Sequence, residues 1–216
     1  MEAGGERIGS IIDNLRKTYP HSRTALTFSN PLEILIATIL SAQCTDKKVN
    51  EITPGLFKKY PAAEDFAKAD RLELEREIRP TGFFRNKAKN IIAACRAIVQ
   101  NFNGKVPDKM EDLISLPGVA RKTANIVLSS GFQIAKGIAV DTHVKRLSGR
   151  LGLSREANPD KIEQDLLRVI PQDAWLDFNY LLVNHGRAVC RARKPLCGDC
   201  RLRDLCPYPS KTGESS

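Results

Sequence analysis

The sequence predicts an all-α fold, and three of its features carry that prediction. Apolar residues recur along much of the chain at the three- and four-residue spacing of a helical face. Segments that alternate strictly between apolar and polar residues are missing, and aromatic residues make up only 6% of the chain, so a sheet is not expected. A chain of 216 residues is long enough to form one or two domains with buried cores.

The expected helices in the first half of the chain are placed by their apolar faces and their ends. The first contains the apolar face from Ile8 to Leu15. The second begins after Asn30-Pro31, because asparagine caps a helix N-terminus and proline suits the first turn. A longer apolar stripe over residues 88–102 predicts a helix that stops near Gly104.

The stretch MEDLISLPGVARKTANIV, residues 110–127, predicts two helices joined by a tight turn. Pro117 cannot continue the first helix, and Gly118 permits a positive φ and a close backbone approach. The second helix begins with outward N–H groups beside Arg121 and Lys122, which together form a phosphate-binding corner. The alternative is an ordinary helical hairpin with a solvated basic start. Spacing alone does not separate the two, but the basic composition favours phosphate binding.

Two further helices are expected in the last third of the chain. One opens at Asn158-Pro159 with the same cap pattern, and the other runs from about residue 175 toward residue 189.

The charge balance points to a polyanionic partner. Lys and Arg number 34 and Asp and Glu 25, which gives a net charge of +9 and favours nucleic acid over a membrane surface. No stretch of eighteen apolar residues exists, and the N-terminus lacks the apolar core of a signal peptide. We therefore expect an intracellular protein without a membrane partner, in the cytoplasm or nucleoid if the source is prokaryotic.

Residues 190–206 read CRARKPLCGDCRLRDLC and contain four cysteines. Inside a cell, clustered cysteines indicate metal ligands rather than disulfides. Their spacing fits neither the usual zinc site nor the two-cluster ferredoxin run, and no water-activating partner is near, so a closed structural site is expected. Spacing alone leaves zinc and iron–sulfur both open. The predicted ligands are Cys190, Cys197, Cys200 and Cys206.

Several segments together resemble the endonuclease III family, which are DNA glycosylases with AP-lyase activity in the helix-hairpin-helix superfamily. LPGVARKTANIVL is followed by AVDTHVKRL (139–147) and by the four-cysteine segment. Upstream, ILIATILSAQCTDKKVN (34–50) and TGFFRNKAKNI (81–91) resemble two more family segments, the second a lesion-probing loop. The resemblance extends from about residue 8 to Cys206.

The resemblance implies a helix-hairpin-helix DNA glycosylase fold, in which two helical domains flank a DNA-binding cleft. One domain would be a bundle over residues 25–134 that carries the hairpin. The other would be discontinuous, formed from residues 1–24 and 135–216, and would hold a [4Fe-4S] cluster on the four cysteines. The cluster would support a basic DNA-binding loop and take no part in catalysis.

The implied activity is base excision repair, as a bifunctional glycosylase and lyase. The enzyme would remove oxidised or hydrated pyrimidines from duplex DNA through a lysine Schiff base and cut 3′ to the abasic site by β-elimination. Lys122 would be the nucleophile and Asp141 its proton acceptor. An ordinary lysine, with a pKa of about 10.4, is only about 0.04% neutral at pH 7, so such an acceptor or desolvation is needed. Without the resemblance, Asp141 reads as a helix N-cap.

The implied partner is double-stranded DNA that contains damaged bases or abasic sites, bound by a monomer. Gln43 would fill the hole left by the extruded base, although it also suits a helix end. Phe83 would wedge between bases, unless it is an ordinary core aromatic, and Lys87 would lie close to the DNA backbone. The hairpin and the basic loop are expected to supply the remaining contacts: Leu116, Gly118, Ala120, Arg121, Arg191, Arg193 and Lys194.

Two residues depart from the family pattern, and other activities compete. Ala120 stands where a second glycine is common, and Phe83 where an aliphatic wedge is frequent. Mismatch-thymine and adenine glycosylases share the cluster but usually lack a lysine at position 122. The adenine enzymes also carry a further C-terminal domain, which we do not expect here because the sequence has ten residues after Cys206. A non-enzymatic DNA-binding iron–sulfur protein would not need both Lys122 and Asp141, and an electron carrier would leave the hairpin without a role.

Overall fold

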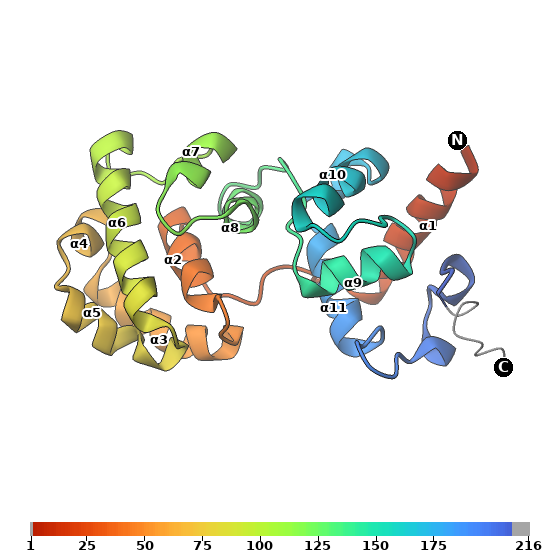
Figure 1. Ribbon diagram of the computed structural model, residues 1–216, viewed down its shortest axis with the longest axis horizontal. Helices are drawn as coiled ribbons and strands as arrows, with labels where there is room; N and C mark the ends of the chain where they lie inside the picture. Colours follow the sequence, from red (N-terminus) through yellow and green to blue (C-terminus); the bar gives the residue numbers. More distant parts are fainter. Residues whose placement is uncertain (1, 209–216) are drawn as a thin grey trace. The chain divides into compact units, whose positions relative to one another are not determined.

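The chain folds into helices joined by short loops, and the computed structural model describes residues 2–208, with side chains from residue 5 onward. No strand occurs within these residues, so the all-α prediction is confirmed. The chain divides into two units (Figure 1), a continuous unit over Thr24–Ile134 and a discontinuous unit formed by the segment up to Arg23 and the segment from Ala135 onward. The division expected from the sequence differs by one residue at the first boundary.

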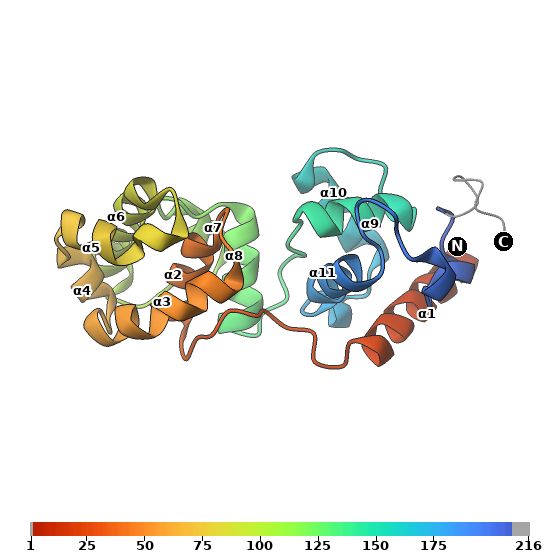
Figure 2. The ribbon, with the colours of Figure 1, turned by 90° about the horizontal axis from the view of Figure 1, so that it is seen from below.

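The continuous unit is a helical bundle organised around two central helices. Its helices are α2 (Pro31–Ser41), α3 (Asp46–Lys59), α4 (Ala63–Lys68), α5 (Arg71–Ile78), α6 (Phe84–Phe102), α7 (Met110–Ser115) and α8 (Arg121–Ile126). Every side chain from Ile34 to Leu40 in α2 is buried, and α2 contacts α3, α6 and α8. The amphipathic helix α6 contacts α2, α4 and α5 (Figure 2), so the two helices hold the bundle together.

Helix ends follow the predicted chemistry in this unit. The Asn30 side chain accepts a hydrogen bond from the Glu33 amide at 3.0 Å and caps α2 as expected. Helix α6 ends where Asn103 and Gly104 take φ values of 52° and 76°. It begins at Phe84, four residues before the apolar stripe. The residue that precedes it, Phe83, has a left-handed backbone conformation.

The discontinuous unit contains α1 (Glu2–Thr18), α9 (Thr142–Arg150), α10 (Pro159–Val169) and α11 (Phe178–Ala188). Helix α11 begins three residues later than predicted. The short 3₁₀ segment Gln172–Ala174 and a hydrogen bond from the Trp175 indole to the Ile170 carbonyl, at 2.8 Å, precede it.

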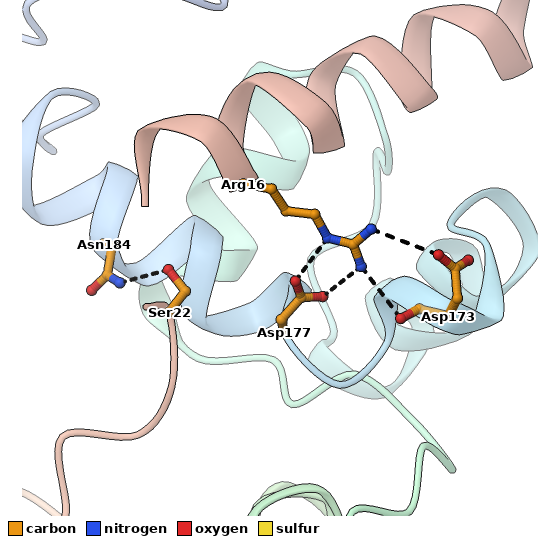
Figure 3. A network of polar contacts seen from close by, with 5 residues as sticks. All are labelled: Arg16, Ser22, Asp173, Asp177 and Asn184. Carbon is orange, nitrogen blue, oxygen red and sulfur yellow. Dashed lines mark hydrogen bonds and ion pairs between the residues drawn. The ribbon is translucent and has the colours of Figure 1, made fainter. Parts of the chain in front are cut away.

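Polar contacts join the N-terminal helix to the C-terminal third (Figure 3). The Arg16 guanidinium donates to both carboxylate oxygens of Asp177, at 2.9 and 3.1 Å, and to the Asp173 carbonyl at 3.3 Å. Asn184 donates to the Ser22 hydroxyl at 2.9 Å. A two-pronged arginine–carboxylate pair fixes orientation as well as distance, so α1 is held in one register on the segment that bears the cysteines.

The apolar core of this unit explains why α1 belongs to it. Ile11, Ile12 and Leu15, on the face predicted from the sequence, are buried with Phe178 and Leu181 of α11. Among the described residues, no helix is both long and apolar enough to cross a membrane.

Candidate nucleic-acid interface and cluster site

The predicted hairpin is formed by α7, α8 and the turn between them. Leu116 is 2% exposed, and the Val119 amide donates to its carbonyl at 3.1 Å. The Leu116 side chain therefore anchors the turn in the core of the continuous unit.

The turn requires glycine at position 118 but not at position 120. Gly118 has a φ of 77°, and a Cβ there would lie 2.7 Å from the Cβ of Asn90 in α6. Both the left-handed backbone and the close packing exclude a larger residue. Ala120 has a φ of −85° and a ψ of 166°, which is extended backbone that alanine adopts without strain. The departure at this position therefore leaves the turn intact.

Lys122 lies in the first turn of α8, directly after the hairpin. Its side chain is exposed, as is that of Arg121, and no acidic residue is present in this turn. Among the described residues, no hydrogen bond or ion pair engages the Lys122 ammonium. The amine is thus presented at the positive end of a helix and is available to a ligand.

The two predicted probes of the DNA stack lie on one concave surface of the continuous unit. Gln43, Phe83, Gly118 and Thr123 all line a hollow of about 220 Å³. Gln43 and Phe83 have φ values of 54° and 47°, and the Phe83 side chain is 63% exposed. Residues with a Cβ rarely adopt the left-handed conformation. Phe83 is therefore not a core aromatic, and both side chains are displayed by strained backbone.

Lys87, which is predicted to lie close to the DNA backbone, has a buried side chain. The side chain is 5% exposed, and its ammonium donates to the Leu40 carbonyl at 2.7 Å and to the Thr81 carbonyl at 2.8 Å. Burial lowers the pKa of Lys87 from its usual value. A direct contact with the DNA backbone is incompatible with these bonds, because the ammonium points into the protein.

Asp141 forms the N-cap of α9 in the discontinuous unit. Its Oδ1 accepts hydrogen bonds from the His143 and Val144 amides, each at 2.8 Å. The capping role favoured by local sequence is therefore present. Within the described part of the chain, Oδ2 accepts no hydrogen bond, and the residue is only half-buried. The two amides fix the carboxylate and leave one oxygen for a substrate.

The four cysteines of residues 190–206 line a single pocket in the discontinuous unit. Apolar side chains that include Leu147, Leu151 and Leu202 complete its wall. Burial raises the pKa of the Cys200 and Cys206 thiols, and the neighbouring thiols add to the rise. Bound iron would offset this cost, because it stabilises the thiolate form.

The donor set fits an iron–sulfur cluster. Thiolates are the usual ligands of such clusters, and all four cysteines line this one pocket. In residues 2–208, no three His, Cys, Asp or Glu side chains are arranged to hold one metal ion.

Hydrogen bonds surround the cysteine sulfurs. The Leu202 amide lies 3.4 Å from the Cys200 sulfur, and His185 Nε2 lies 3.5 Å from the same atom. The other ring nitrogen of His185 is 3.1 Å from the Tyr19 hydroxyl, and burial lowers the pKa of this histidine to about 4. The neutral ring is thus held in place between Tyr19, the residue after α1, and a predicted cluster ligand.

Arg150 is a site residue that the sequence does not reveal. Its guanidinium donates to the Cys190 sulfur at 3.2 Å, to the Arg191 carbonyl at 2.7 Å and to the Ala192 carbonyl at 3.1 Å. It therefore ties the last turn of α9 to the start of the basic loop. No local pattern marks this role, because about forty residues separate the partners.

The basic loop itself is exposed. The side chains of Arg191, Arg193 and Lys194 all face solvent, and Lys194 has a φ of 50°. Three residues predicted to contact phosphates thus lie on one loop. Arg150 holds this loop through hydrogen bonds to its backbone carbonyls.

Comparison with known proteins identifies matching families for most of the chain. Residues 36–172 match the HhH-GPD superfamily base excision DNA repair proteins, and residues 190–206 match the iron–sulfur binding domain of endonuclease III. The endonuclease III of Synechocystis sp. (strain ATCC 27184 / PCC 6803 / Kazusa) is 55% identical over 96% of this chain and 94% of its own length.

Solved structures show the same similarity. A trapped covalent intermediate of endonuclease III with DNA, described as an estranged-adenine complex, has a TM-score of 0.90 and 41% identity, covering 96% of this chain and 98% of that one. A thermostable thymine-DNA glycosylase has a TM-score of 0.86 and 25% identity, covering 95% of this chain and 98% of that chain.

Proposed function

The chain belongs to the endonuclease III family of the HhH-GPD superfamily, and from this premise we propose that it removes oxidised or hydrated pyrimidines from duplex DNA and cuts 3′ to the abasic site. As a member of this family, the protein is a base excision repair enzyme, namely a DNA glycosylase and AP lyase with an iron–sulfur cofactor. The single observation that carries the proposed chemistry is the exposed amine of Lys122 at the start of α8, directly after the hairpin.

Lys122 acts as the nucleophile. The nitrogen lone pair forms a bond to C1′ while the bond from C1′ to the base nitrogen breaks, and the base leaves with that electron pair. The nitrogen then loses one proton, and the bond from C1′ to the ring oxygen O4′ breaks as O4′ takes up a proton, which gives a protonated Schiff base that keeps one N–H. Removal of a proton from C2′ gives an enamine, whose electrons then form the C2′=C3′ double bond while the C3′–O bond breaks and the phosphate leaves with that electron pair, which cuts the strand.

The amine must be neutral when it attacks, and helix α8 contributes little to that. A helix N-terminus favours the neutral amine by about 1 kcal/mol or less, and DNA phosphates act in the opposite sense. Desolvation by bound DNA and transfer of the proton to Asp141 supply the rest. The free Oδ2 of Asp141 is the proposed acceptor, and its charge also stabilises the oxocarbenium character at C1′.

Gln43 and Phe83 make the extrusion of the damaged nucleotide favourable. Unstacking a base costs a few kcal/mol, so the vacated space must be filled. Gln43 offers a donor and an acceptor to the unpaired base, and the exposed ring of Phe83 stacks between neighbouring bases. Their shared position on one hollow supports this pairing of roles.

The hairpin and the basic loop hold the DNA backbone. Outward amides at the start of α8, together with Arg121, receive one phosphate, and Arg191, Arg193 and Lys194 receive others. A [4Fe-4S] cluster on the four cysteines supplies a rigid cross-link beneath the loop when it is bound. The protein acts as a monomer on chromosomal DNA, in the nucleoid if the cell is bacterial.

A panel of duplexes tests this function. Each duplex carries one lesion, namely an oxidised pyrimidine, a hydrated pyrimidine, a G·T mismatch, an adenine opposite an oxidised guanine, or an abasic site. Release of free base and strand cleavage are measured separately. Release from the two damaged pyrimidines together with cleavage of the abasic strand is expected, and release from the mismatches alone would assign a different specificity.

A further inference from the structure

Lys87 is a buried lysine that joins two loops of the continuous unit. Leu40, which accepts one of its hydrogen bonds, lies in the last turn of α2, and Thr81, which accepts the other, ends the 3₁₀ segment Arg79–Thr81. Lys87 itself lies in the first turn of α6. One ammonium therefore connects the ends of two segments that are about forty residues apart in the sequence.

Each of these segments leads directly to a probe of the DNA stack. Gln43 follows Leu40 by three residues, and Phe83 follows Thr81 by two. Both probes have a positive φ, which is unfavourable for a residue with a Cβ and persists only where the surroundings determine it. The two carbonyls that accept hydrogen bonds from Lys87 belong to residues that shortly precede Gln43 and Phe83 in the sequence. Lys87, Gln43 and Phe83 all line the same hollow.

A simple packing role does not explain a lysine at this position. Burying an ammonium is costly unless it is hydrogen-bonded, and an apolar side chain would fill the same volume without that cost. The carbonyl of Leu40 belongs to the C-terminal end of α2, where unsatisfied carbonyls attract a cation. The two hydrogen bonds to backbone carbonyls therefore offset part of the cost of burying the Lys87 ammonium. An apolar side chain at this position could not form them.

We propose that Lys87 is a positioning residue, which holds the Gln43 and Phe83 loops in the conformation that enters the DNA stack beside an extruded nucleotide. This inference rests on the proposed functions of Gln43 and Phe83. Lys87 acts through these two residues and touches neither the DNA nor the reacting atoms. Its loss would slow extrusion of a stacked base more than it would slow reaction at an abasic site, where no base has to leave the stack.

The test compares Lys87→Met with Lys89→Met. Methionine keeps the length of the side chain and removes the donors, and Lys89 is an exposed lysine two residues further along α6. Four quantities are measured on each variant: single-turnover base release, fluorescence of a 2-aminopurine beside the lesion, borohydride crosslinking to an abasic site, and affinity for undamaged duplex over a range of salt.

For Lys87→Met we expect base release and the fluorescence change to fall at least about tenfold, with abasic crosslinking lowered by less than about threefold and the salt slope unchanged. Lys89→Met should extrude and release base as the wild type does. An equal loss on both substrates would assign Lys87 a purely structural role. A salt slope reduced by about one, with normal extrusion, would place Lys87 on a phosphate instead.

A double-mutant cycle separates positioning from other effects. If Lys87 acts through Phe83, Lys87→Met should lower base release far less in a Phe83→Ala background than in the wild type. Additive losses would contradict the proposal. Should Lys87→Met not fold, Lys87→Gln, a neutral donor, is expected to show the same selective loss on a smaller scale, and equal loss on both substrates would again overturn it.

The outcome also distinguishes this inference from the proposed function. Wild-type protein that neither releases base nor forms the crosslink would refute the function itself. If the wild type is active and the single variants Phe83→Ala and Gln43→Ala release base as fast as the wild type, only the probe roles are refuted. The inference about Lys87 would then fail with them.

Discussion

Asp141 meets a structural requirement as the N-cap of α9, and the proposed function gives the same side chain a chemical role. Its Oδ1 receives two amides of α9, so the capping role is complete without Oδ2. The same two bonds fix the direction of the remaining oxygen, which is what a positioned proton acceptor needs. A substitution that keeps the cap and removes the charge therefore separates the two roles.

Asp141→Asn is that substitution, because asparagine caps a helix about as well as aspartate. The unfolding free energy should change by no more than about 0.5 kcal/mol. Base release from an oxidised pyrimidine should fall by about 10²–10⁴, the range for losing a positioned acid–base group. Crosslinking to an abasic site should suffer less, because no bond to a base is broken there. Base release at the wild-type rate would leave Asp141 as a cap alone.

Arg193 is the residue that tests the basic loop. Arg193→Ala should reduce the slope of log affinity against log salt by about one while leaving the preference for lesions intact. Arg155, an exposed arginine outside this loop, supplies the control, and Arg155→Ala should leave the slope unchanged. An unchanged slope in Arg193→Ala would place the loop away from DNA. Both slopes come from titrations of undamaged duplex.

At the scale of elements, the hairpin depends on one backbone conformation. Gly118→Ala forces a Cβ into the left-handed region and against Asn90, so it should lower the unfolding free energy by at least about 1–2 kcal/mol and weaken DNA binding. A Cβ added at Gly55 in α3 would meet no atom within 4 Å, and Gly55→Ala should raise stability by about 0.5–1 kcal/mol. Thermal unfolding of both variants measures the contrast, and equal effects would contradict this dependence.

Element ends explain which parts of the structure the sequence predicts. Asn30-Pro31 and Asn158-Pro159 start α2 and α10 where expected, because caps and proline are local chemistry. The predicted start of α11 is wrong by three residues, since a 3₁₀ segment and the bond from Trp175 depend on tertiary contacts.

Long-range contacts account for the misplaced and missing site residues. The family resemblance places Lys87 close to the DNA backbone, but it does not reveal that two carbonyls bind the ammonium inside the protein or that one of them belongs to a distant helix. The role of Arg150 depends on carbonyls forty residues away. The predicted hairpin, by contrast, is visible in a continuous run of sequence. Local patterns thus predict elements and exposed residues, whereas the buried polar contacts that position them require the fold.

At the scale of the whole molecule, we expect the iron–sulfur cofactor to support DNA binding by the basic loop of the discontinuous unit. Purified protein should be brown and contain about four irons per chain and no zinc. Cys197→Ser should lower iron content, solubility and DNA affinity together, because the basic loop loses its support. Cys44→Ser removes a thiol of the continuous unit and should leave the iron content unchanged. A colourless, zinc-loaded protein with full activity would overturn the cluster assignment.

The proposed activity as a whole depends on a covalent bond between Lys122 and the sugar. Borohydride reduces a Schiff base irreversibly, so the wild type should crosslink to duplexes that contain an oxidised pyrimidine or an abasic site. In Lys122→Gln, crosslinking and strand cleavage should both disappear while DNA binding survives. Lys161→Gln, which alters an exposed lysine of α10, should crosslink as the wild type does. Gel analysis of the borohydride-treated complexes measures this directly, and a Lys122→Gln variant that still forms the crosslink at the wild-type rate would contradict the mechanism.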